Sequence, residues 1–170
     1  MRISERAAET ADRAAPGHWE DDLLIGCQGR SAIITLVERH TRYVPLGALP
    51  HGRDAVSAAE ALTGVAERLP GHLRRSLVWD QGMEMAEHAR FTVATGCPVF
   101  FCDPHSPWQR GSNENTNRLL RQYFPKGVFD FAAIDQGGLD RVARELNTRP
   151  RQTLGWDTPA QRPNQFLATG

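Results

Sequence analysis

Three features that identify whole classes of protein are scarce or missing in this chain of 170 residues. No stretch approaches the roughly 18 consecutive apolar residues of a membrane-spanning helix, and the first residues lack the apolar core of a signal peptide. Charge of one sign is also missing, because 20 basic residues balance 20 acidic residues. That balance excludes a strongly basic nucleic-acid module on totals, although not a local basic patch. With 40% hydrophobic residues, the sequence predicts a globular protein of one domain in the cytoplasm.

Cysteine is scarce as well. Cys27, Cys97 and Cys102 form an odd set without a CxxC pair, and no histidine lies at zinc-ligand spacing from them. Small apolar side chains buried in the core are the interpretation that we prefer for all three. A cysteine nucleophile would need a partner, and we identify none in the sequence.

What the sequence does contain is the pattern of an α/β domain. Three closely spaced extended segments predict an antiparallel meander, and the segments that follow alternate between strands and helices. The predicted strands are 19–27, 31–38, 43–49, 73–80 and 98–102, and the predicted helices are 54–69, 84–95, 112–124 and 134–146. This βββαβαβα order, with one further helix, predicts a five-stranded mixed sheet flanked by helices. We expect residues 1–16 to form a linker or tail.

Asp22 is the least expected residue of the first strand, because it interrupts the otherwise apolar segment WEDDLLIGC. Strand alternation places Asp22 with Glu20 and Leu24 on one face, and Asp21 on the other. Asp21 and Asp22 therefore cannot point into the same site. A pair of acidic residues in solvent at a strand end and a carboxylate held for a function are interpretations of equal weight here.

Asp80 and Glu114 have ordinary structural explanations when each is taken alone. Asp80 follows a short strand and precedes Gln81-Gly82, where an Asp commonly serves a turn, although ligands also bind at such strand ends. Glu114 stands in the first turn of a predicted helix, where the helix dipole favours an acid. It begins a polar stripe that continues with Asn117, Arg118 and Arg121.

Taken together, the three carboxylates suggest a shared site. Two Asp residues on strands and a Glu on a following helix can hold two divalent cations about 4 Å apart, as two-metal phosphoryl transfer requires. Mg²⁺ prefers such hard oxygen ligands and keeps other positions for water and substrate phosphates. One cation would activate a water or a 3′-hydroxyl, and the other would stabilise the leaving oxygen.

Five stretches of the chain follow a known pattern: GHWEDDLLIG, SAIITLVERHTRYVPL, DQGMEMAEH, DPHSPWQRGSNENTNRLLRQYFPKG and LNTRPRQTLGWDTPAQ. In these stretches the chain resembles the catalytic core of bacterial transposases of the insertion-sequence-thirty family, within the DDE transposase and retroviral integrase superfamily. The resemblance implies an RNase H-like fold and metal-dependent DNA cleavage and strand transfer. It also implies two Mg²⁺ ions, replaceable by Mn²⁺, and a homo-oligomer that binds transposon ends and target DNA.

By motif match, the resemblance assigns the catalytic and metal-binding triad to Asp22, Asp80 and Glu114. Glu114 follows Asp80 by 34 positions, the spacing typical of the family. The chain departs from the family pattern at Asp21, Gln81 and Met85, and none of these departures removes a metal ligand. Transposases of this family carry helix-turn-helix DNA-binding regions upstream, so we expect 17–170 to be the catalytic core without that region.

DNA contacts are expected beside the predicted metals. The segment 110–126 holds four basic side chains against one acidic one, which favours salt-dependent contacts with phosphates. The loop 105–111 resembles the mobile loop of integrase cores, and its tryptophan could stack on a base or pack on the loop itself. The candidate DNA-binding residues are Trp108, Arg110, Asn117, Arg118, Arg121 and Lys126, with Arg149 and Arg151 as an extension.

Two alternatives to a transposase core stay open at the level of the sequence. One is a non-catalytic module of the same fold that binds DNA or dimerises. The other is a stand-alone nuclease of the same fold. Both would keep the predicted sheet, and they differ from the transposase in metal binding and in the joining of DNA ends.

Overall fold

The computed structural model describes residues 16–49, 52, 54–79, 85–101 and 111–149, and of residues 85–86, 101 and 111–114 it gives the backbone alone. The strands are β1 His18–Ile25, β2 Ala32–Glu38, β3 Leu46–Ala48, β4 Ser76–Trp79 and β5 Val99–Phe101. The α-helices are α2 Ala55–Glu67, α3 Met85–Thr95, α4 Gly111–Leu120 and α5 Gln136–Asn147, with 3₁₀ turns η2 Cys27–Gly29, η3 Gly71–Leu73 and η5 Phe131–Ala133. No helix in these ranges combines the length and the apolar character needed to cross a bilayer.

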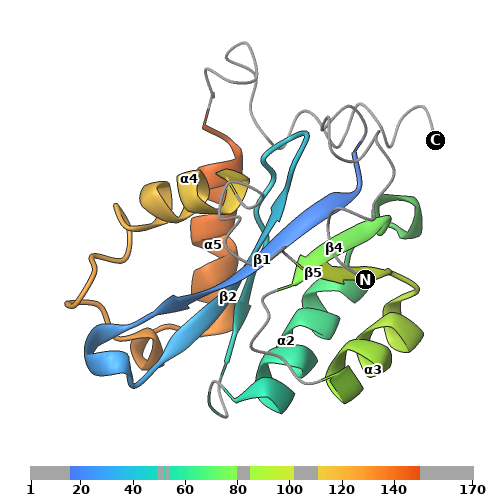
Figure 1. The fold of residues 1–170 in the computed structure, drawn as a ribbon. Coiled ribbons are helices and arrows are strands. Elements are labelled where there is room, and N and C mark those ends of the chain that lie inside the picture. The colour runs from blue at the N-terminus through green and yellow to red at the C-terminus, as the bar shows by residue number, and fades with distance from the viewer. Residues whose placement is uncertain (1–15, 50–51, 53, 80–84, 102–110, 150–170) are drawn as a thin grey trace.

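The five strands form one mixed sheet in the order β3-β2-β1-β4-β5 (Figure 1). β1, β2 and β3 pair antiparallel, as the tight turns between them dictate, while β4 and β5 join parallel to β1 after helical crossovers. The predicted fold class and element order are confirmed. β1 is the central strand, and both of its faces are covered.

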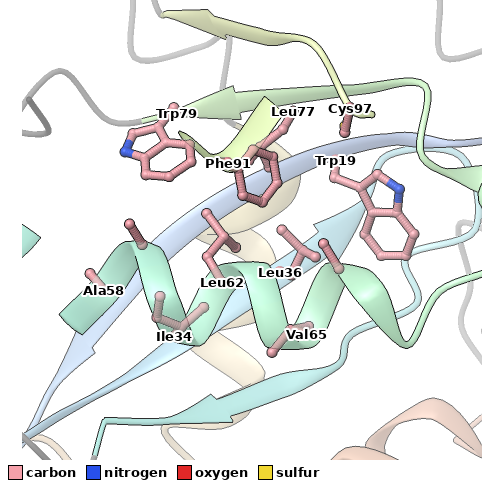
Figure 2. Packing of buried hydrophobic residues seen from close by; sticks show 12 residues of the cluster. Trp19, Ile34, Leu36, Ala58, Leu62, Val65, Leu77, Trp79, Phe91 and Cys97 are labelled. Carbon is pink, nitrogen blue, oxygen red and sulfur yellow. The ribbon is translucent and has the colours of Figure 1, made fainter. Parts of the chain in front are cut away.

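Each face of the sheet carries its own hydrophobic core. Helices α2 and α3 cover one face and α4 and α5 cover the other (Figure 1). Trp19 and Leu23 of β1 pack into the α2–α3 side, where Figure 2 shows Trp19, Leu77, Trp79 and Phe91 around α2. Leu24 packs into the α4–α5 side. The predicted alternation of β1 is therefore confirmed, and it directs Asp22 toward the α4–α5 layer.

Several element boundaries differ from the prediction: the strand expected over 19–27 ends at Ile25 before η2, and the strand expected over 73–80 begins at Ser76 after η3. The helix expected over 112–124 ends at Leu120, and the chain tightens there, with Tyr123 N–H donating to Leu120 O at 3.0 Å. The bulk of Pro125 and the packing of Phe124 against Phe129 and Phe131 explain this early end. The strand expected over 43–49 is shortened to 46–48, because Pro45 accepts from Leu36 N–H but has no N–H of its own to continue the ladder with β2.

Helix α5 protects the edge of the sheet with two amide side chains. Asn147 Oδ1 accepts from Val44 N–H at 2.9 Å, and Asn147 Nδ2 donates to Val44 O at 2.9 Å. Gln136, three turns earlier, accepts from Ala48 N–H and donates to Leu46 O, both at 2.8 Å. Outward backbone groups of Val44, Leu46 and Ala48 are thus bonded by side chains of α5, which occupies this edge and disfavours its pairing with another strand.

We predict that Asn147→Leu lowers the free energy of unfolding by about 2–4 kcal/mol, because it leaves the buried N–H and C=O of Val44 without partners. Urea denaturation measures the change. Thr148→Val is the control, since it alters an exposed neighbour and should change stability by less than about 0.5 kcal/mol. Equal effects of the two substitutions would contradict the role of Asn147.

The cysteines differ in burial. Cys97 is 3% exposed, as predicted, and its burial raises the pKa of the thiol to about 12. Cys27 is half-buried in η2, so the prediction of full burial was wrong there, because a 3₁₀ turn at the end of a hairpin lies at the surface. Cys102 lies outside the described residues.

The raised pKa of Cys97 predicts a pH dependence of stability. An unfolded thiol ionises near its ordinary pKa of about 8.5, whereas the folded thiol keeps its proton to about 12, so alkali favours the unfolded chain. The stability advantage of the wild type over Cys97→Ala should therefore shrink by up to about 1.4 kcal/mol per pH unit above about pH 9. Urea denaturation of both proteins at about pH 8 and about pH 10.5 measures it, and a pH-independent difference would contradict it.

Candidate active site

The site begins where β1 continues beyond the described end of β4. The parallel register pairs Glu20 with Val78, so Trp79, the last described residue of β4, lies opposite Asp21, while β1 continues to Ile25. Even-numbered residues of β1 bond to β2, as His18 O accepting from Arg39 N–H shows. Leu23 N–H and Ile25 C=O consequently lie on the edge of β1 beyond the described end of β4.

Two polar side chains bond this edge of β1. Asp22 Oδ1 accepts from Leu23 N–H at 2.8 Å, and Arg121 Nη2 donates to Ile25 O at 3.1 Å. Asp22 is half-buried, and Thr35 Oγ1 of the paired strand contacts its backbone oxygen at 3.4 Å. The Asp22 carboxylate is therefore fixed by its own strand.

The second Asp22 oxygen joins the strand to helix α4. Asn117 Nδ2 donates to Asp22 Oδ2 at 2.9 Å across 95 positions of sequence. Asn117 Oδ1 is buried and accepts no hydrogen bond from a described donor. The polar stripe predicted on this helix thus meets β1 through Asn117 and Arg121.

The other predicted site residues are distributed as follows. Glu114 lies in α4, one turn before Asn117, and its side chain is outside the described part of the chain. Arg118 and Lys126 are exposed, and Arg149 contacts Gln122 and Tyr123. Asp80, Trp108, Arg110 and Arg151, with the departures Gln81 and the side chain of Met85, lie outside the described residues.

A buried ion pair below Asp22 was not predicted from the sequence. Glu20, on the same face of β1 and fully buried, pairs with Arg39 Nε at 3.2 Å. The signal that could have found it is the hairpin register, which pairs Glu20 with Val37 and so brings Arg39 diagonally close. The face that carries Asp22 thus holds a second carboxylate with its counter-charge.

The chemistry of the described donors fits a hard divalent cation. A carboxylate has about four lone-pair positions, so each Asp22 oxygen that accepts one hydrogen bond retains capacity for a cation. Among the side chains that the structure describes, no three His, Cys, Asp or Glu are grouped closely enough to hold a metal ion. Asp80 and the Glu114 side chain are not among them.

Comparison with known proteins identifies the family. A family model described as "Integrase core domain" matches residues 12–107, more than half of the chain. The chain belongs to the integrase core domain family. The catalytic core domain of BIV integrase superposes with a TM-score of 0.65 at 18% sequence identity, covering 91% of this integrase core and 98% of that chain. That likeness supports the RNase H-like fold.

Bacterial transposases match this integrase core more closely in sequence. The transposase for insertion sequence element IS1086 of Cupriavidus metallidurans is 51% identical over 168 residues, which are 99% of this chain and 49% of that protein. Transposase InsI for element IS30A of Escherichia coli is 52% identical over 159 residues, which are 94% of this chain and 41% of that protein. The expected resemblance to insertion-sequence-thirty transposases is confirmed, and the chain spans about half the length of these relatives or less.

We predict that Asn117→Asp destabilises this integrase core more at about pH 7 than at about pH 4. The substitution replaces the amide donor by a carboxylate at hydrogen-bond distance from Asp22, and repulsion raises the pKa of the new carboxylate. Stability is then lost as the pH rises through that raised pKa, by about 1–3 kcal/mol. Urea denaturation in metal-free buffer measures the loss.

The matched control is Asn115→Asp, which adds the same charge to an exposed position of the same helix. It should leave stability nearly independent of pH over this range. Indistinguishable pH profiles for the two variants would contradict the contact between Asn117 and Asp22.

Proposed function

We propose that the chain is the catalytic core of a DNA transposase that cleaves DNA at the ends of a mobile element and joins the 3′-hydroxyl to target DNA. Asp22, Asp80 and Glu114 are its catalytic residues and hold two Mg²⁺ ions, which Mn²⁺ can replace. The supporting relatives are transposases of bacterial insertion sequences. DNA cleavage and joining take place in the bacterial cytoplasm in this proposal.

One observation carries the proposal: the Asn117 amide contacts the Asp22 carboxylate at 2.9 Å. Residues three positions apart on an α-helix lie on the same face, with Cβ atoms about 5–6 Å apart. Glu114 precedes Asn117 by one such step within α4. The contact therefore supports a Glu114 carboxylate near Asp22, although 92 positions separate the two in sequence.

The register of β1 and β4 supports Asp80 as the third residue of the proposed carboxylate triad. Trp79 lies beside Asp21, and Asp80 is the next residue of the chain. Consecutive Cα atoms are about 3.8 Å apart, and in this proposal Asp80 therefore reaches the same edge of β1. Asp22 and Glu114 belong to elements that contact each other, and Asp80 follows the strand that pairs with β1.

Residues around Asp22 orient its carboxylate for binding a cation in this proposal. Leu23 N–H and the Asn117 amide orient the Asp22 carboxylate, and Asn117 Oδ1 offers a buried acceptor to a water molecule in the site. When bound, the divalent ions supply Lewis-acid stabilisation of the charge that develops on phosphate oxygens. Exposed Arg118 and Lys126, with Trp108 and Arg110, bind the DNA beside them in this proposal.

The proposal also covers the organisation of the whole protein. Residues 17–170 form the catalytic core, and residues 1–16 form a linker or tail. A transposase of this kind works as a homo-oligomer on transposon ends and target DNA. The greater length of the relatives supports further regions in such proteins.

We predict that Glu114→Gln and Asp22→Asn abolish Mn²⁺-dependent nicking of a supercoiled plasmid and joining of a recessed 3′-hydroxyl oligonucleotide. Glu114→Gln should keep or raise the melting temperature in metal-free buffer, because it removes one of several like charges. Calorimetric titration should show that both variants bind Mn²⁺ more weakly than the wild type does. Glu145→Gln, at an exposed position of α5, is the control and should leave all four measurements (nicking, joining, melting temperature and Mn²⁺ binding) unchanged.

Other outcomes would point to other functions. Wild-type protein that binds no Mn²⁺, or binding that Asp22→Asn and Asp80→Asn leave unchanged, would indicate a non-catalytic module. Cleavage without joining would indicate a nuclease. A large loss of metal-free stability in Glu114→Gln would make Glu114 a structural residue and overturn its assignment.

A further inference from the structure

Arg121, which follows the last residue of α4, directs its guanidinium to backbone carbonyls of the protein. Its Nη2 donates to Ile25 O at 3.1 Å and its Nη1 approaches Phe124 O at 3.4 Å. The side chain is half-buried, and burial lowers the pKa of the guanidinium from its ordinary value without removing its charge. Arg118, three positions earlier, is exposed.

The acceptor on β1 explains why a guanidinium is needed there. Ile25 C=O points away from β2, along the stretch of β1 that extends beyond the described end of β4. Among the described residues no strand bonds this half-buried carbonyl, and a buried backbone acceptor needs a donor. Arg121 reaches it from the helix layer, and the forked guanidinium can serve a second carbonyl at the same time.

Arg121 also completes a two-point attachment of α4 to β1. The first point is the bond between Asn117 and Asp22, and the second is the bond between Arg121 and Ile25. The acceptors are three strand residues apart, about 10 Å, and the donors are four helix residues apart, about 6 Å. A single point would let the helix pivot about Asn117, whereas two points fix its direction along the strand.

We propose that Arg121 is a positioning residue: its guanidinium holds the end of α4 on Ile25 so that Asn117 and Glu114 stay at Asp22, and it is not a DNA-phosphate contact. The inference rests on the proposed function for the role of Glu114. The positioning role takes the place of the DNA contact that the charge and spacing of Arg121 predict. The attachment of α4 itself can be tested without metal or DNA.

Arg121→Met tests the proposal in two measurements. Amide hydrogen exchange of 116–120 in metal-free protein should speed up, because the end of α4 loses its bond to β1. The slope of log affinity for duplex DNA against log salt should stay unchanged, because no phosphate contact is lost. Arg118→Met should do the reverse, lowering the slope by about 0.9 and leaving the exchange unchanged.

Mn²⁺ affinity separates positioning of the site from a purely structural role. Arg121→Met should weaken Mn²⁺ binding about 10–100-fold, the usual cost of losing a group that orients metal ligands. Asn147→Leu, which weakens the distant edge of the sheet, should lower stability and leave Mn²⁺ affinity of the folded protein unchanged. Arg121→Lys should fall between wild type and Arg121→Met, since one ammonium cannot serve both carbonyls, and it replaces Arg121→Met if that variant does not fold.

A fall in the salt slope of Arg121→Met, with or without faster exchange, would overturn the proposal, and so would unchanged exchange. Unchanged Mn²⁺ affinity alongside faster exchange would also overturn it, because the attachment would then not position the site. If the wild type binds no Mn²⁺, the proposed function fails, while exchange and salt slope still decide whether Arg121 anchors α4.

Discussion

The backbone groups of β1 that lie beyond the described end of β4 are the constraint on which the site depends. A central strand that continues past its parallel neighbour exposes backbone groups on one edge, and buried backbone groups must find partners. Here the partners are side chains, Asp22 for Leu23 N–H and Arg121 for Ile25 C=O. The same need that satisfies the strand therefore draws a carboxylate and the end of α4 to one place.

The strand alternation of β1 decides which charges meet. Asp21 and Asp22 are neighbours in sequence, yet Trp19 and Leu23 show that the odd-numbered face packs against α2 and α3. The even-numbered face carries Glu20 and Asp22 toward α4 and α5, and Glu20 is neutralised locally by Arg39. Removing two charges from water is costly unless they are paired, so this pairing lets a second acid lie on the Asp22 face. Asp22 is left to interact across the layer with Asn117.

Much of this arrangement could be predicted from the sequence, because it follows from local periodicity. The order of elements, the facing of Asp22 and the polar stripe of α4 each depend on residues within one or two turns or strand repeats. Other features depend on contacts over many positions and leave no local signal. In the sequence Asn147 and Gln136 look like ordinary helix residues, and only the structure shows that they bond the edge of the sheet at β3. Arg121 looks like a surface cation, and only the structure shows that its guanidinium bonds Ile25 C=O. Every residue carries the same backbone carbonyl, so no sequence motif shows which carbonyl a side chain will bond.

The helical rotation of α4 places some of its polar side chains against β1 and others in solvent. Asn117 and Arg121 are four positions apart and face β1, while Arg118, one position beyond Asn117, turns by about 100° and is exposed. In the proposed function, the inner side of α4 belongs to the carboxylate site, and its outer side carries a cation that can meet a phosphate backbone beside that site. The chain has no net charge, so in this proposal the attraction to DNA depends on where the cations face and not on their number. The position of α4 on β1 would then set both the geometry of the carboxylates and the approach of the nucleic acid.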